Sequence, residues 1–310
     1  MKSRQTALPE IALLLAAGAL PLLLQAWGEE FYIGFATRML IFALAATSLN
    51  FIVGYGGMVA FGHAAFFGSG AYVVALLMAA GITSAWLSWP LALVAAALLA
   101  LLIGALSLRT RGVYFIMITL AFAQMLYYIT VSLQVAGGDD GLPLERRSAL
   151  APLDLGSDAT LYWVTLGLLA TILYGLRRLA DSRFGKALAG LRQNAPRMEA
   201  LGYPVRQLQL VCFVIGGALA GLAGALLANQ NGLASPNLLY WKQSGMLLVM
   251  VILGGVGLRY GGVAGAIMLL GLEEILGLYT AHGHLYLGLF LLGVVLFAPQ
   301  GLAGLALRRR

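Results

Sequence analysis

The chain has 310 residues and a net charge of +7; 61% of its residues are hydrophobic and only 10% are charged. A soluble domain carries about 25% charged residues because its surface faces water, so this composition excludes an ordinary soluble protein and indicates one that spans a membrane. The apolar runs are continuous rather than alternating, which excludes a transmembrane β-barrel.

Apolar runs follow one another along the whole chain, each close to the roughly 20 residues that a helix needs to cross a bilayer. The pattern predicts an all-α polytopic membrane protein in which residues 1–310 form a single transmembrane domain. About ten transmembrane helices are expected, at residues 9–27, 32–53, 58–80, 86–108, 112–134, 160–180, 207–228, 243–258, 262–280 and 284–299. The first is taken as a span rather than a secretory signal, because Gln25, Ala26 and Trp27 make a poor cleavage site.

Basic residues fall mainly in alternate loops. With a cytoplasmic N-terminus, 15 of the 19 Lys and Arg residues lie in cytoplasmic segments, whereas Arg146, Arg147, Lys242 and the acidic pair Asp139 and Asp140 lie outside. The cytoplasmic set is Lys2, Arg4, Arg109, Arg111, Arg177, Arg178, Arg183, Lys186, Arg192, Arg197, Arg206, Arg259, Arg308, Arg309 and Arg310. Because basic loops stay in the cytoplasm, both termini are predicted to be cytoplasmic.

Residues 54–70 depart from the pattern of simple spans. They contain six glycines and no charged residue where a cytoplasmic turn is expected. Non-helical backbone at membrane depth is tolerated only where the surrounding protein or water pairs its polar groups. We therefore expect at least one broken or re-entrant Gly-rich segment here, with a plain hairpin as the alternative.

Small residues recur at regular spacing in a later span. Gly217, Gly221 and Gly224 stand three and four residues apart, together with Ala220 and Ala228. On a helix this spacing places them on one side, where the backbone of a neighbouring helix is able to approach closely. Tight helix packing is the expected use of these residues.

The cytoplasmic stretch 181–206 carries signals for a short helix. Asn194 is a good N-cap, Gly202 suits the left-handed position after a helix, and Pro204 prevents the helix from continuing. A helix of about seven residues, 195–201, does not persist alone in water. It either packs on its own bundle or inserts into a separate cytoplasmic protein.

Signatures of catalysis are missing from the sequence. The nearest approach to a Walker A loop has Ala187 after Gly185-Lys186, so no ATP site is expected in this chain. The three histidines are dispersed, and the single cysteine, Cys212, forms no intrachain disulfide, so no metal site is expected either. Oriented loops explain the net positive charge without nucleic-acid binding. The sequence indicates a passage through the membrane rather than an enzyme.

Several motifs resemble one family of bacterial membrane proteins. Glu199-Ala200-x-Gly202 looks like the cytoplasmic coupling motif of ABC importer permeases. The run Leu-Asn-Phe-Ile-Val-Gly-Tyr-Gly-Gly at 49–57 is similar to the LivM-type branched-chain amino acid permeases. So are the segments 61–72, 110–115, 137–142, 182–188, 253–257 and 297–302. Their order and spacing carry the resemblance from about residue 38 to residue 302.

The resemblance implies a permease subunit of a heteromeric importer in the bacterial inner membrane. Its partners would be a second homologous permease, two cytoplasmic ATPase subunits and a periplasmic or lipid-anchored substrate-binding protein, besides membrane lipid. ATP and Mg²⁺ would be bound by the ATPase subunits and no cofactor by this chain. Residues 181–206 would be the cytoplasmic coupling loop, with Asn194, Arg197, Glu199, Ala200 and Gly202 as its coupling residues.

Two positions depart from the family pattern. Family members usually carry a glutamine and a serine where this chain has Met58 and Ala60. If this segment lines the passage, the substrate preference is expected to differ from that for leucine, isoleucine and valine. The same family also moves urea, short amides and aromatic or carboxylic acids, which are the alternative substrates.

Polar residues within the spans are the candidates for the substrate pathway: Asn50, His63, Tyr114, Gln124, Glu273 and Glu274. His63 either caps a broken helix or lines the passage, and Asn50 and Gln124 either join helices or line it. Intramembrane carboxylates usually face a bundle interior or water, so Glu273 and Glu274 either line the passage or a subunit contact, or lie at the membrane interface.

Two other classes of transporter compete with this interpretation. In an ion-coupled secondary transporter, Glu273 and Glu274 would be the proton carriers. The capped cytoplasmic helix argues against that class. A channel for a small neutral solute is disfavoured because no segment has the pattern of a selectivity filter.

Overall fold

The structure is a computed structural model that describes residues 30–280, 282–298 and 301–302. The helices are α2 (Glu30–Asn50), α3 (His63–Ala79), α4 (Ala85–Ser107), α5 (Val113–Ser132), α6 (Asp158–Asp181), α7 (Arg183–Gln193), α8 (Ala195–Ala200), α9 (Val205–Asn231), α10 (Trp241–Gly254), α11 (Gly261–Tyr279) and α12 (Gly283–Phe297). A π-helical turn, η1 (Phe51–Tyr55), continues α2, and two 3₁₀ turns are η2 (Gln134–Ala136) and η3 (Pro236–Leu238). The predicted span at 9–27 and the arginines at 308–310 lie outside the described residues.

Six of the described helices are long and apolar enough to cross a membrane: α2 with η1, α4, α5, α6, α9 and α11. The apolar helices α3, α10 and α12 are shorter and stand where three further spans were predicted. The fold is therefore mainly helical and fits a polytopic membrane protein, and the total of ten spans stays a prediction.

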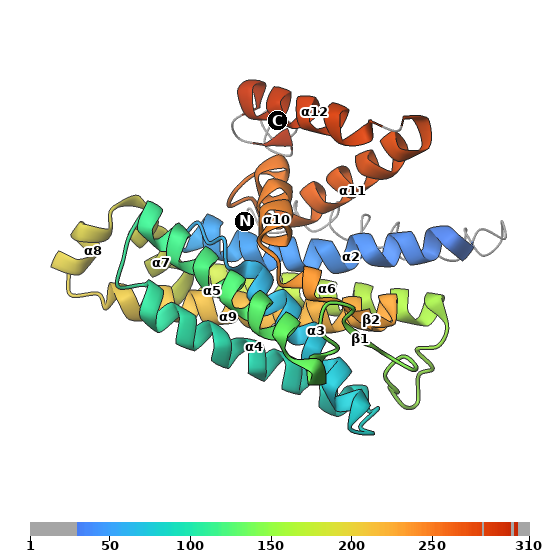
Figure 1. The fold of residues 1–310 in the computed structure, drawn as a ribbon. Coiled ribbons are helices and arrows are strands. Elements are labelled where there is room, and N and C mark those ends of the chain that lie inside the picture. The colour runs from blue at the N-terminus through green and yellow to red at the C-terminus, as the bar shows by residue number, and fades with distance from the viewer. Residues whose placement is uncertain (1–29, 281, 299–300, 303–310) are drawn as a thin grey trace.

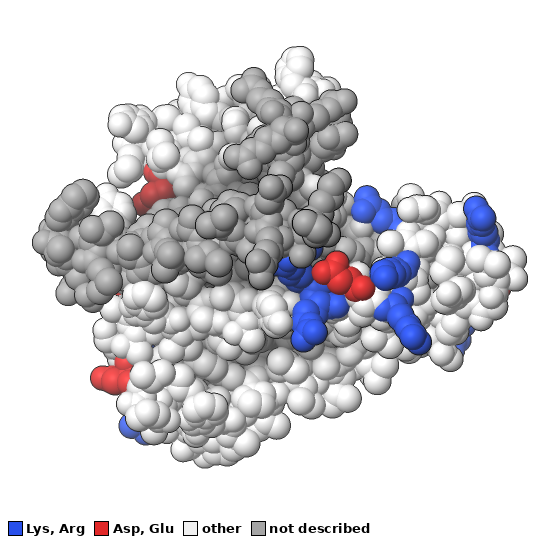
Figure 2. Space-filling model, turned by 180° about the vertical axis from the view of Figure 1, so that it is seen from behind, with Lys and Arg blue, Asp and Glu red and all other residues white. Residues whose placement is uncertain are grey.

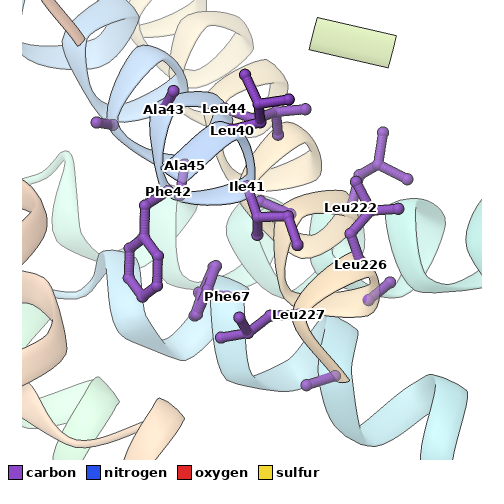
Figure 3. Packing of buried hydrophobic residues seen from close by; sticks show 14 of the residues in the cluster. Leu40, Ile41, Phe42, Ala43, Leu44, Ala45, Phe67, Leu222, Leu226 and Leu227 are labelled. Carbon is purple, nitrogen blue, oxygen red and sulfur yellow. The ribbon is translucent and has the colours of Figure 1, made fainter. Parts of the chain in front are cut away.

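Two helices run through the centre of the bundle, and the others surround them (Figure 1). In α2 with η1, 83% of the most apolar window is buried, and in α9 72% is buried. These helices contact each other, and α9 also packs on α3 and α4. Figure 3 shows Ile41 of α2 near Leu222, Leu226 and Leu227 of α9, with Phe67 of α3 beside them. The low charge of the central parts of α2 and α9 follows from this position, because other helices cover them.

Glycines bring the backbones of α3 and α9 into direct contact. A Cβ atom built on Gly224 would lie 1.7 Å from the carbonyl oxygen of Phe67, and one on Gly70 would lie 1.9 Å from that of Gly221. Gly217 similarly faces the Ala100 side chain of α4 at 2.5 Å. The close packing predicted from the glycine spacing is confirmed, and α9 has glycine-mediated contacts with two neighbours.

The segment between α5 and α6 folds over one end of the bundle. Its strand β1 (Leu142–Pro143) pairs antiparallel with β2 (Leu233–Ala234), which follows α9. The Ser148 amide donates to Asn229 Oδ1 at 2.7 Å, and Arg147 forms an ion pair with Asp158 at the start of α6. These contacts fix the segment to the ends of α9 and α6.

Charged residues divide between the two ends. Asp139, Asp140 and Glu145 are exposed in the segment between α5 and α6, at the end that holds β1 and β2. Helices α7 and α8 project from the opposite end (Figure 1), where the loops carry most of the basic residues. Figure 2 shows blue side chains gathered toward one side of the rear face. This asymmetry is the pattern expected of cytoplasmic and external loops.

We expect Gly224→Ala to destabilise the protein strongly, because the added methyl group meets the backbone of α3. Overpacking of this kind costs about 1–3 kcal/mol or more, which lowers the melting temperature by several degrees. The matched control is Gly167→Ala in α6, where a Cβ atom meets nothing within 4 Å. Thermal unfolding in detergent checks this, and equal melting temperatures for the two variants would contradict the close contact.

Candidate functional site

The chain leaves the helical conformation between α2 and α3. Helix α2 continues through the π-turn η1 to Tyr55, residues 56–62 are not helical, and α3 begins at His63. The predicted start of this span at residue 58 was wrong by five residues, because Gly57 turns the backbone to a φ of +67° and the helix starts only beyond Gly62. We call residues 56–62 the break.

The first residue of α3 is tied to the interior of α2. His63 Nε2 lies 2.8 Å from Ser48 Oγ, and both residues are fully buried. The Ser48 hydroxyl donates its proton to the Ala45 carbonyl, so His63 Nε2 is the donor in their contact. Ser48 precedes Tyr55 by seven residues, or about 10 Å of helix. The chain therefore returns alongside the end of α2 before α3 starts, and the non-helical residues 56–62 separate the two helices.

Side chains from two other helices bind amides at and after the break. The Ala64 amide, in the first turn of α3, donates to Ser244 Oγ of α10 at 2.8 Å. The Phe61 amide donates to Thr119 Oγ1 of α5 at 3.2 Å. Each bond replaces a partner that a continuous helix would have supplied. Ser48, Thr119 and Ser244 were not predicted as site residues, because a single hydroxyl in an apolar run carries no distinguishing pattern.

Asn50 joins the end of α2 to the loop between α10 and α11. Its Nδ2 donates to the Leu258 carbonyl at 2.8 Å, and its Oδ1 accepts from the Gly257 amide at 2.8 Å. Both polar atoms of the side chain are thus paired with backbone, and the side chain is buried. Asn50 holds two segments together.

Arg192, near the end of α7, reaches the same place from the segment between α6 and α9. Its Nη1 donates to the Gly54 carbonyl of η1 at 2.5 Å. From the sequence, Arg192 was expected only to be one of the basic loop residues. Its partner is 138 positions away, and nothing local to either residue indicates the pairing.

Met58 and Ala60 are both buried in the break. They belong to an apolar cluster with Phe51, Phe66 and Phe213. Packing in this cluster explains their apolar character. A link between these two positions and substrate preference stays a prediction.

The segment between α6 and α9, predicted to be cytoplasmic, contains two helices, α7 and α8. In α8 the caps are those expected: Asn194 Oδ1 accepts from the Arg197 amide at 3.0 Å, and Gly202 has a φ of +83°. No residue of α8 is buried, and the exposed Glu199 contacts the exposed Arg111 at 3.7 Å, an ion pair of small value in water. Ala200 ends the helix. Helix α7, which was not predicted, buries Leu188 and Leu191 against the bundle and supports α8.

The remaining pathway candidates lie on α5 and α11. Tyr114 is 73% exposed near the start of α5, whereas Gln124 is half-buried and its Oε1 has no partner among the described residues. Glu273 and Glu274 are half-buried on α11, and neither forms an ion pair with another described residue. The structure thus brings Asn50 and His63 to the two sides of the break and leaves the other four elsewhere.

The family model for the "branched-chain amino acid transport system / permease component" matches residues 31–299. The chain belongs to this family. The permease is 28% identical to the "high-affinity branched-chain amino acid transport system permease protein LivM" of Escherichia coli K12, over 94% of this chain and 73% of the relative. The LivM protein of Salmonella typhimurium gives the same identity and coverage.

A second group of relatives matches about half of the permease. The "autoinducer 2 import system permease protein LsrC" of Escherichia coli DH10B is 31% identical over 51% of this chain and 47% of its own length. No solved structure matches the permease. The family resemblance drawn from motif order is confirmed by these comparisons.

Replacing Ser244 with alanine is expected to destabilise the permease, because the Ala64 amide would be left buried without its partner. An unpaired buried donor costs about 1–3 kcal/mol, so the melting temperature should fall by a few degrees. The control is Ser132→Ala in α5, where an exposed hydroxyl donates only to the Tyr128 carbonyl. Identical thermal unfolding of the two variants would show that Ser244 does not support the start of α3.

Proposed function

We propose that this permease is the transmembrane subunit of an ABC importer that moves branched-chain amino acids into a bacterial cell. The family match over residues 31–299 carries the proposal, together with relatives of that named function that align with 94% of the chain. ATP hydrolysis is assigned to separate ATPase subunits, and this chain supplies the passage through the inner membrane.

Helix α8 is the proposed contact with an ATPase subunit. Six residues are too few for a stable helix in water, so α8 depends on its caps and on α7. Because none of its residues is buried, the whole surface around Arg197, Glu199 and Ala200 is available to a partner. A short, capped and exposed helix such as α8, at the end of the bundle that carries the basic loops, is suited to binding in a cleft of a cytoplasmic protein.

Helix α5 is the proposed wall of the passage and contact with the second permease. Only 17% of its most apolar window is buried, which is the lowest value among the six long helices. One side exposes Tyr114, Met117, Met125 and Tyr128, whereas α4 exposes mainly leucines such as Leu98. Leucine suits lipid, and phenol and thioether groups suit a mixed polar and apolar solute or a protein partner.

A groove at the far end of α5 supports the same assignment. It is shallow and open to the outside, and it is lined by Met125, Tyr128, Ile129, Ser132 and Leu133. We assign this groove to the entrance of the passage, with Tyr114 and Gln124 further along it.

Asn50 and His63 are assigned to holding the break rather than to contact with substrate, since their paired atoms face other protein segments. Glu273 and Glu274 are assigned to a polar surface of α11. An ion-coupled carrier would need them to exchange protons during transport.

The proposed orientation places α7 and α8 in the cytoplasm. Cysteines introduced at the exposed positions Asp140 and Leu201 should react with a membrane-impermeant thiol reagent from opposite sides, Asp140→Cys in intact cells and Leu201→Cys only after permeabilisation. The native Cys212 is fully buried and should give no background. Labelling of both variants in intact cells would contradict the orientation.

Transport itself is tested in proteoliposomes that contain the whole complex, with ATP inside and the binding protein outside. Uptake of labelled leucine should require both ATP and the binding protein. Uptake of urea, a short amide or an aromatic acid in place of leucine would correct the substrate while preserving the class.

The double variant Glu273→Gln and Glu274→Gln separates the two classes of transporter, because the amides keep the size of the side chains and abolish titration. An importer should keep ATP-dependent uptake that is insensitive to collapse of the proton gradient. Uptake by this chain alone, driven by a pH gradient without nucleotide and lost in the double variant, would overturn the proposal.

A further inference from the structure

Arg192 connects the segment between α6 and α9 to the break. It is the penultimate residue of α7, next to the turn into α8, and its guanidinium binds the Gly54 carbonyl at the end of η1. Gly54 precedes the break by two residues. The Arg192 side chain thus forms a polar link between the helix that supports α8 and the end of the central helix of the bundle.

The end of α2 needs such a partner. The last carbonyls of a helix lack amide partners, and a cation near them is favourable because of the helix dipole. In η1 the Gly56 amide binds the Phe51 carbonyl and the Met58 amide binds the Ile52 carbonyl. Neither α2 nor η1 has a basic residue in its own last turn. Arg192 supplies the cation from another part of the chain.

Three glycines leave room for the Arg192 side chain. A Cβ atom on Gly257 would lie 2.8 Å from Arg192 Nη1, and one on Gly57 would lie 3.3 Å from its Cγ. A Cβ atom on Gly54 would lie 2.5 Å from the Cα of Gly257. The guanidinium therefore occupies a slot between η1 and the α10–α11 loop that larger residues would close.

The two walls of the slot, η1 and the α10–α11 loop, are held together by hydrogen bonds that do not involve Arg192. Asn50 fixes the α10–α11 loop to α2 through Gly257 and Leu258. Beyond the break, the start of α3 is fixed by other partners, on α2 and α10. A movement of α7 is therefore passed to Gly54 through this charge-assisted hydrogen bond, beside the packing of Leu188 in the apolar cluster that contains Phe51 and Met58.

We propose that Arg192 is a positioning residue that transmits movement of α7 and α8 to the break, and so couples ATP hydrolysis to opening of the passage. The inference rests on the proposed function, in which α8 contacts an ATPase subunit. Arg192 itself touches neither substrate nor nucleotide in this assignment. Its role is distinct from that of a cap that only stabilises α2.

The first test measures the number of ATP molecules hydrolysed per leucine imported by the complete complex. Arg192→Gln removes the charge and should raise this ratio about tenfold, within the usual range of coupling between sites. Arg192→Lys keeps a cation but loses the fork of donors, and should give an intermediate ratio. Arg178→Gln, an equal loss of charge at an exposed site on α6, should leave the ratio unchanged.

A second test detects the effect of the Arg192–Gly54 hydrogen bond on the break without a transport measurement. A spin label on a cysteine at Val59, an exposed position in the break, should become more mobile in Arg192→Gln and stay unchanged in Arg178→Gln. Unchanged label mobility in Arg192→Gln would overturn the inference. An unchanged number of ATP molecules hydrolysed per leucine imported would also overturn it. So would a parallel fall of ATP hydrolysis, uptake and melting temperature, because that result is expected of a residue that only stabilises the end of α2. Absence of ATP-dependent uptake by the wild-type complex would instead refute the proposed function and with it the coupling role. The mobility of the spin label would still show whether Arg192 restrains the break.

Discussion

Backbone amides and carbonyls inside a membrane need partners from the protein, because the hydrocarbon offers none. Where α2 ends and α3 begins, several helices and one arginine of α7 supply these partners. Ser48 and Ser244 hold the start of α3, and Asn50 and Arg192 hold the end of α2 and η1. This requirement fixes the positions of α2, η1, α3, α7 and α10 relative to one another. Removing the break would remove the reason for these contacts, and an uninterrupted helix would need none of them.

The arrangement also explains why polar residues in the spans have unequal surroundings. Asn50 and His63 point to backbone or to another buried side chain, whereas Tyr114 is largely open. A buried polar group is stabilising only when it is paired, and an exposed one is free to meet a changing partner. The first pair is thus suited to a fixed part of the molecule, and α5 to a surface that successive solute molecules pass.

Features that depend on local sequence were predictable. The caps of α8 at Asn194 and Gly202 follow from residues within nine positions of each other, and the glycines at 54–57 marked the break. The start of α3 was misplaced because Gly57 turns the backbone before it, and the partner of the Ala64 amide, Ser244, lies 180 positions away. Arg192 and Asn50 bind segments 138 and more than 200 residues away, and a single sequence gives no means of pairing them. The roles of the coupling and pathway residues remain predictions.

The contact between α3 and α9 constrains how a transporter of this design is able to acquire a new cargo. No larger residue fits at Gly70 or Gly224, because a Cβ atom at either position would meet a carbonyl oxygen of the other helix. Substitutions on the outer side of α5, the proposed wall of the passage, displace no neighbouring backbone. In the proposed assignment, the shape of the passage is therefore able to change while the packing of α3 on α9 is kept.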